Sequence, residues 1–288
     1  MAEVKDFQIK IVPNWCRGCG HYAVLAAIQR ALAQSGREPH EVALVSGIGC
    51  SGRISGYLNV YGFHSTHGRA LPVAQGLKLA NRKLTVIACS GDGDGFAIGT
   101  NHAIHAIRRN IDITYIVMDN HVYGLTKGQV SPRSDWGFKT KTTPTGAIEA
   151  PLNIMGMALA AGATFLAQGF SANLPQLTEL IVQGLAHKGF ALINVFSPCV
   201  TFNHVNTYAW FKEHITDLAD LPGYDPSDKN AAMQAINDYQ GLITGLIYRD
   251  SGKPCYEDLL PGYASEPLSE ATLRLSADQF AALLASYK

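Results

Sequence analysis

Apolar residues recur along the first two thirds of the chain in two alternating patterns. Five short runs are almost continuously apolar and rich in β-branched residues, as is typical of strands buried on both faces of a sheet. These runs are 42–46, 84–89, 113–118, 163–167 and 191–196. The stretches with helical spacing of apolar residues are 22–33, 70–80, 96–107, 153–161 and 174–185. Strands that alternate with helices predict a doubly wound, mostly parallel α/β sheet with helices on both faces.

The strand pattern fades after about residue 203, where Tyr, Pro, Asp and Gly become more frequent. The sequence therefore predicts an α/β domain over residues 1–205. Residues 206–288 are expected to form a tail of helices and loops that packs on this domain or on a partner subunit. That tail is too short for a second sheet of typical domain size.

Composition excludes several classes of protein. The 288 residues are 47% apolar, which is enough to bury a substantial core. Lys and Arg total 23 against 23 for Asp and Glu, so no basic surface for nucleic acid is expected. Neither a bilayer-spanning apolar run nor the apolar centre of a signal peptide is found in the sequence. We therefore expect a cytoplasmic protein without membrane association, whose six cysteines are thiols or metal ligands.

Unusual residues follow four of the predicted strands. The loops 47–51, 91–94, 119–124 and 197–199 each begin where an apolar run ends. Ligands of doubly wound sheets bind at the carboxyl ends of the strands. We therefore expect all four loops to open on one edge of the sheet.

The second of these loops begins the segment GDGDGFAIGT, residues 91–100. A glycine-rich turn after a strand usually binds phosphate, but two carboxylates there would repel it. The spacing matches neither the dinucleotide fingerprint nor a P-loop. Asp92 and Asn120 offer oxygen ligands on neighbouring loops, which suits Mg²⁺ bound together with a diphosphate. Taken singly, each motif could equally be a turn or a cap without a ligand.

Four cysteines lie near this edge of the predicted sheet: Cys16, Cys19, Cys50 and Cys199. By count they suit a structural zinc or an iron–sulfur cluster equally well. Zinc sites usually consist of two close pairs, and the wide separation of Cys50 from Cys199 favours a cluster. Cys89, inside a buried strand, and Cys255, in the tail, are expected to be structural.

These motifs resemble a known family. A Gly-Asp-Gly followed by an Asn-containing turn is similar to the thiamine diphosphate motif, although Asp119 stands where a second Asn is usual. More specifically, the chain resembles the β subunit of 2-oxoacid:ferredoxin oxidoreductases over roughly residues 10–205. The matching segments are WCRGCGH, SGIGCSGR, STHGRALPVAQG, GDGDGFAIGTNHAIHAIRRN and YGLTKGQ.

The resemblance implies thiamine diphosphate, Mg²⁺ and one [4Fe–4S] cluster. The Asp92 and Asn120 side chains and the Val122 carbonyl would hold the magnesium. The cluster would bind the four cysteines named above. Residues implied to contact the cofactor are Ile48, Gly49, Cys50, Ser51, His67, Gly93, Asp94, Gly124 and Leu125.

Three further side chains are candidates for substrate chemistry. His67 could reach the diphosphate or the reacting carbon, and Arg53 and Lys127 could bind a substrate carboxylate. The alternatives are a solvated histidine and two surface cations. His102 and His105, one turn apart on a predicted helix, are expected to be packing or surface groups.

The implied activity is coenzyme A-dependent oxidative decarboxylation of a 2-oxoacid. Electrons would pass through the cluster to ferredoxin, and the reaction could run in reverse as carboxylation. Arg53 favours 2-oxoglutarate over pyruvate, because it could bind a second carboxylate. An α subunit would supply the pyrimidine-facing domain and the coenzyme A site. The alternatives are a non-oxidative thiamine diphosphate enzyme with zinc, and a stand-alone iron–sulfur carrier.

Overall fold

The computed structural model describes residues 2–260, 267–270 and 274–287. These residues form one eight-stranded sheet in the order β2-β1-β3-β4-β6-β5-β8-β7. The strands are β1 (Val42–Ser46), β2 (Tyr61–His64), β3 (Thr85–Gly91), β4 (Ile113–Asp119), β5 (Phe165–Phe170), β6 (Phe190–Phe196), β7 (Thr216–Asp217) and β8 (Ile243–Arg249). Neighbouring strands run parallel except for β5 and β8. The predicted doubly wound, mostly parallel sheet is therefore confirmed.

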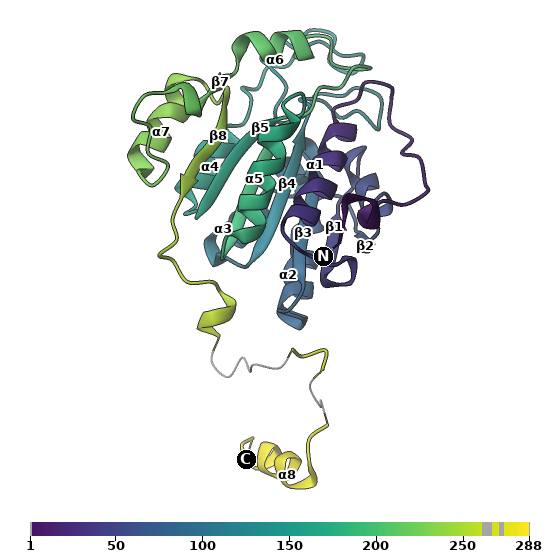
Figure 1. Ribbon diagram of the computed structural model, residues 1–288, viewed down its shortest axis with the longest axis vertical. Coiled ribbons are helices and arrows are strands. Elements are labelled where there is room, and N and C mark those ends of the chain that lie inside the picture. The colour runs from purple at the N-terminus through teal and green to yellow at the C-terminus, as the bar shows by residue number, and fades with distance from the viewer. Residues whose placement is uncertain (1, 261–266, 271–273, 288) are drawn as a thin grey trace.

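Helices cover both faces of this sheet (Figure 1). They are α1 (His21–Gln34), α2 (Ala70–Ala80), α3 (Thr100–Arg109), α4 (Ile154–Ala160), α5 (Leu174–Ala186), α6 (Tyr208–His214), α7 (Lys229–Asp238) and α8 (Ala277–Ala285). Helices α1 and α5 pack on one face, while α2, α3, α4 and α7 pack on the other. In β4, Tyr115 and Val117 face the second layer, whereas Ile116 and Met118 face the first. Burial on both faces explains the continuous apolar runs.

The expectation that only helices and loops follow residue 205 is wrong in one respect. Strand β8 pairs antiparallel with β5 and extends the sheet, and the short β7 pairs with β8. Thr244 and Gly245 interrupt the apolar pattern of β8, which hides it in the sequence. The division at residue 205 itself stays a prediction. Parts of the predicted tail, 261–266, 271–273 and 288, lie outside the described residues.

The connection after β3 differs from a plain helix. A short π-helical turn, Asp94–Ile98, precedes α3, so the helix predicted from residue 96 begins at Thr100. Turns of this kind occur frequently at functional sites. Glycine is required at position 95 because this turn packs closely against Tyr115: a Cβ atom there would lie only 2.1 Å from the Tyr115 hydroxyl oxygen. Among the described residues, no helix has both the length and the apolar character needed to cross a bilayer.

Candidate functional site

The loops at the carboxyl ends of β1, β3 and β4 enclose one pocket, as the sheet topology requires. All nine residues predicted to contact the cofactor line it: Ile48, Gly49, Cys50, Ser51, His67, Gly93, Asp94, Gly124 and Leu125. The predicted magnesium ligands Asp92, Asn120 and Val122 line the same pocket. Residues separated by up to 77 positions in the sequence, from Ile48 to Leu125, are thus brought together.

Asp94 connects its own loop to the loops that contain Ile48 and Gly68. Its Oδ1 accepts hydrogen bonds from the backbone N–H of Ile48, at 3.1 Å, and of Gly68, at 2.6 Å. The His67 Nδ1 lies 3.9 Å from the same oxygen, with the imidazole 36% exposed at the pocket. A Cβ atom on Gly47 would fall 1.8 Å from Asp94 Oδ2. This carboxylate therefore shapes the pocket in addition to lining it.

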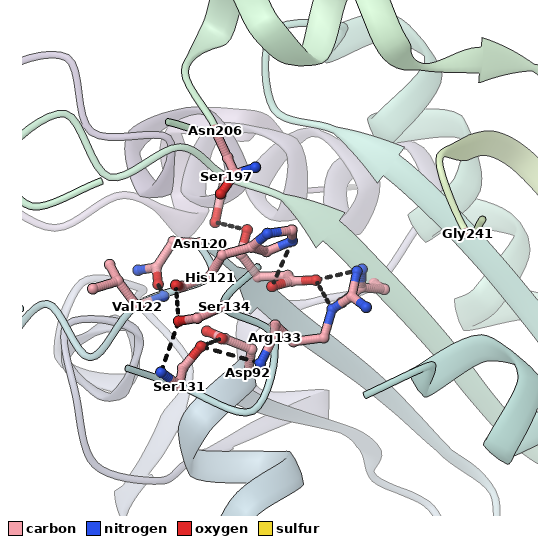
Figure 2. A network of polar contacts seen from close by, with 12 residues as sticks. Asp92, Asn120, His121, Val122, Ser131, Arg133, Ser134, Ser197, Asn206 and Gly241 are labelled. Carbon is pink, nitrogen blue, oxygen red and sulfur yellow. Dashed lines mark hydrogen bonds and ion pairs between the residues drawn. The ribbon is translucent and has the colours of Figure 1, made fainter. Parts of the chain in front are cut away.

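Asp92 is buried and has one carboxylate oxygen fixed by the protein. The Ser131 hydroxyl donates a hydrogen bond of 2.5 Å to its Oδ2, as Figure 2 shows. Burial and the charge of Asp119 raise the pKa of Asp92 to about 7, although the Ser131 hydrogen bond opposes the shift. A divalent cation at the carboxylate would favour its ionised form. The chemistry of Asp92 therefore fits a cation ligand.

The turn after β4 presents the other two predicted magnesium ligands. The backbone N–H of Val122 donates to Asn120 Oδ1 at 3.0 Å, which fixes the amide group. His121, between them, adopts a left-handed backbone conformation with φ of 58°, and its carbonyl accepts a hydrogen bond from Ser134 Oγ. Together with Asp92 these groups offer only oxygen donors to the pocket, which suits a hard cation such as Mg²⁺.

Asp119, the departure from the usual motif, is neutralised by residues that the sequence did not single out. Arg133 Nε donates to its Oδ2 at 3.0 Å, and Asn194 Nδ2 donates to the same oxygen at 3.1 Å. Burial disfavours the Asp119 carboxylate, but the charges of His121 and Arg133 outweigh it and hold its pKa well below the ordinary range. The ion pair therefore permits an acidic residue directly beside Asn120.

A second cavity of about 260 Å³ adjoins the pocket. All four predicted cluster ligands line it: Cys16, Cys19, Cys50 and Cys199. A Cβ atom on Gly124 would lie 3.5 Å from Cys50 Sγ and 3.7 Å from Cys199 Sγ, so Gly124 lies next to both thiols. Burial, with a smaller effect of neighbouring thiols, raises the pKa of Cys19 to about 12 and that of Cys50 to about 11. Binding of a metal centre must therefore displace their protons.

The size of this cavity bears on the choice between zinc and a cluster. The four thiols surround a cavity of about 260 Å³, a space that several atoms can fill. The donor set therefore fits a polynuclear cluster with thiolate ligands. Cys89 is fully buried in β3. Cys255 is buried next to Pro254, whose carbonyl accepts a hydrogen bond from the Asn110 side chain.

The remaining candidates lie outside the pocket predicted to bind thiamine diphosphate. Arg53 and Lys127 line the cysteine cavity, and the backbone N–H of Lys127 donates to the Gly124 carbonyl at 3.1 Å. His102 and His105 lie on α3.

His21 was not predicted as a site residue, yet it lines both cavities. It is 1% exposed, and burial lowers its pKa to about 4. The one signal for it in the sequence is its place directly after the C-x₂-C turn.

Comparison with known proteins agrees with this geometry. The family model described as "Thiamine pyrophosphate enzyme, C-terminal TPP binding domain" matches residues 47–195. The model for the C-terminal part of the pyruvate ferredoxin oxidoreductase beta subunit matches residues 199–265.

Individual relatives point the same way. The chain is 44% identical over 270 residues to the 2-oxoacid:ferredoxin oxidoreductase subunit beta of Saccharolobus solfataricus, covering 88% of each. It is 45% identical over 207 residues to the 2-oxoglutarate synthase subunit KorB of Archaeoglobus fulgidus, covering 71% of this chain and 77% of that one.

A solved structure extends the likeness to the fold. The 2-oxoglutarate:ferredoxin oxidoreductase of Magnetococcus marinus, with 2-oxoglutarate, coenzyme A and succinyl-CoA bound, has a TM-score of 0.90 and 37% identity. The match covers 98% of this chain and 96% of that one. The resemblance drawn from the motifs is therefore confirmed: the chain has a thiamine diphosphate-binding domain and belongs to the β subunits of the 2-oxoacid:ferredoxin oxidoreductases.

Proposed function

We propose that this chain forms the diphosphate and iron–sulfur half of an enzyme that converts 2-oxoglutarate and coenzyme A to succinyl-CoA and CO₂. Electrons pass through one [4Fe–4S] cluster to ferredoxin, and the reaction is reversible as a carboxylation. The observation that carries the proposal is the adjacency of the two cavities. Cys50, Gly124 and Leu125 line both of them. A site for two-electron carbon chemistry thus borders a site for a one-electron acceptor.

The chain's own residues hold and orient the two groups. Asp92, Asn120 and the Val122 carbonyl hold Mg²⁺, which removes the repulsion between the Asp92 carboxylate and a diphosphate. Cys16, Cys19, Cys50 and Cys199 bind the cluster as thiolates. When bound, thiamine diphosphate would supply the nucleophile and the electron sink for decarboxylation of a 2-oxoacid, and the cluster would accept electrons one at a time.

The substrate assignment depends on two cations. Arg53 and Lys127 both line the cysteine cavity, and 2-oxoglutarate carries two carboxylates where pyruvate carries one. Arg53 can bind a carboxylate through two parallel hydrogen bonds, whereas Lys127 acts as a point charge. The relative from Archaeoglobus fulgidus is named a 2-oxoglutarate synthase subunit, and the Magnetococcus marinus structure contains 2-oxoglutarate. These observations support 2-oxoglutarate over pyruvate.

The cofactor site is completed by a second subunit. The pocket described above accounts for the diphosphate end of the cofactor, and membership among β subunits implies an α partner. We assign to that partner the domain facing the aminopyrimidine and the coenzyme A site. The assembly acts in the cytoplasm, and ferredoxin binds near the cysteine cavity.

Reconstitution tests this function directly. The chain is purified with and without its α subunit, and iron, acid-labile sulfide, zinc and thiamine diphosphate are measured. We expect about four irons per chain. Reduction of ferredoxin that depends on 2-oxoglutarate and coenzyme A should require both subunits, and pyruvate should be used far less well. Stoichiometric zinc without iron would support a non-oxidative enzyme, and full turnover by the isolated chain would contradict the two-subunit site.

The two cations give a separate prediction. Arg53→Gln and Lys127→Gln should each raise KM for 2-oxoglutarate about ten-fold, because each removes a carboxylate partner, while KM for coenzyme A stays within about two-fold. Arg30→Gln, at an exposed position of α1, is the matched control and should change neither constant. Steady-state kinetics of the assembled enzyme measure this. Wild-type KM values in both variants would show that Arg53 and Lys127 are surface cations that do not bind the substrate.

A further inference from the structure

The imidazole of His21 is enclosed at the boundary between the two cavities. It lines both of them, although only 1% of the residue is exposed. Neither ring nitrogen has a hydrogen-bond partner among the described residues. The Trp15 ring packs edge-on against it at 5.4 Å between centroids, and Trp15 Nε1 donates to the Cys50 carbonyl at 2.7 Å. An aromatic wall anchored to a cysteine loop thus holds the imidazole in place.

Other buried histidines of the described chain have polar neighbours. His187 Nε2 lies 2.8 Å from Thr164 Oγ1. The ring nitrogens of His121 also lack a hydrogen-bond partner among the described residues, but its Nε2 lies 3.5 Å from Asp119 Oδ1, within ion-pair distance of a carboxylate. An imidazole without such neighbours carries the full cost of removing its N–H and lone pair from water. A native protein rarely leaves that cost uncompensated, so an unpartnered buried group indicates a missing partner. For His21 that partner belongs in one of the cavities it lines.

The backbone prevents His21 from turning away. His21 is the first residue of α1, and the preceding Gly20 packs directly on the loop after β6. A Cβ atom on Gly20 would lie 2.7 Å from the Ser197 backbone, and the Gly20 N–H donates to the Pro198 carbonyl at 3.3 Å. The same loop carries Cys199. The start of α1 is therefore fixed against a cysteine-bearing loop, and the side chain stays between the cavities.

The main chain of His21 already faces the cysteine side. Its backbone N–H lies near enough to the Cys19 thiol to oppose, in part, the rise in that thiol's pKa that burial causes. An imidazole keeps at least one N–H donor in either tautomer. The cysteine cavity, lined by four sulfur atoms, is a region of acceptors, and more so when it holds a cluster with its own sulfides. On the side of the cysteine cavity, the imidazole N–H of His21 is therefore a donor next to sulfur acceptors.

We propose that His21 is a positioning residue that donates its imidazole N–H to a sulfur of the cluster and thereby raises the cluster's reduction potential. Hydrogen bonds to cluster sulfurs stabilise the more negative, reduced state, so the cluster accepts an electron more readily. The inference rests on the proposed function, because it requires a cluster on the four cysteines. Through the reduction potential of the cluster, His21 would set how easily electrons leave the thiamine site.

The experiment uses the assembled two-subunit enzyme and three variants. His21→Leu removes the donor, His21→Asn keeps a side-chain N–H, and His40→Leu, at an exposed position, is the control for loss of a histidine. Iron is counted in each, and the cluster is titrated by electron paramagnetic resonance at controlled potentials. Thiamine diphosphate affinity is measured in parallel by isothermal titration calorimetry.

We expect His21→Leu to keep about four irons and to show about a ten-fold lower ratio of reduced to oxidised cluster at a given potential, equivalent to a midpoint about 59 mV lower. His21→Asn should recover most of this loss, and His40→Leu should match the wild type. An unchanged midpoint in His21→Leu overturns the proposal, whether or not thiamine diphosphate affinity falls. Should His21→Leu fail to hold iron, His21→Asn decides: a wild-type midpoint supports the proposal, and loss of its cluster overturns it. Absence of iron from the wild type would instead refute the proposed function itself, and the inference with it.

Discussion

Replacement of Cys199 by alanine is expected to abolish the broad visible absorption of the iron–sulfur cluster and to leave less than about one iron per chain. Cys199 lies in the loop after β6 and lines the same cavity as the N-terminal pair Cys16 and Cys19. A [4Fe–4S] cluster needs one thiolate for each iron, and loss of one ligand exposes that iron to solvent. Because Cys199 is only partly buried, alanine should cost the fold little.

The matched control is Cys255→Ala. Cys255 is buried, but it lies after β8, where the Pro254 carbonyl accepts a hydrogen bond from Asn110, and it does not line the cavity of the four thiols. This variant should keep about four irons and the visible spectrum of the wild type. Iron analysis and absorption spectra of both variants decide the assignment. A full cluster in Cys199→Ala, with loss of iron in Cys255→Ala, would show that the ligands were assigned wrongly.

The central part of the fold was predictable because it is buried on both faces. The runs 42–46 and 113–118 coincide with β1 and β4 to within one residue, since every side chain there packs against a helix layer. Strand β2 could not be predicted in this way. All four of its residues are exposed at the sheet edge, so no apolar pattern marks them. Strand β8 was missed because Thr244 and Gly245 break its pattern.

The position of the site was predictable for a topological reason. Parallel strands bring their carboxyl ends to one edge, so the loops that begin at Gly47, Gly91 and Asn120 had to converge. The residues that support the site carry no comparable signal. Ser131 and Arg133 lie in a long connection without regular structure, and only the folded chain places them beside Asp92 and Asp119.

Asp92→Ala is expected to weaken binding of thiamine diphosphate with Mg²⁺ by at least about 100-fold. The carboxylate is the one charged ligand among the three proposed for the magnesium, so its loss leaves the diphosphate without its main link to the protein. Ser131→Ala should have a smaller effect, about ten-fold, because it removes only the hydrogen bond that orients Asp92. Calorimetric titration of each protein with the cofactor at a fixed Mg²⁺ concentration measures both affinities. Wild-type affinity in Asp92→Ala would exclude Asp92 as a magnesium ligand.

Thermal unfolding without cofactor separates this loss of binding from loss of folding. Burial raises the pKa of Asp92 from 3.8 to about 7, so the folded chain binds this proton more tightly than the unfolded chain does. Ionisation of Asp92 therefore destabilises the cofactor-free fold progressively as the pH rises from 3.8 to about 7. The alanine variant lacks that penalty, although it leaves the buried Ser131 hydroxyl without its acceptor. We expect the melting temperature of Asp92→Ala to rise relative to the wild type as the pH increases from 3.8 to about 7, because in this range the unfolded carboxylate has lost its proton while the folded one still holds it. A relative fall over the same range would mean that the charged carboxylate stabilises the empty pocket, and the loss of affinity could then no longer be attributed to the metal.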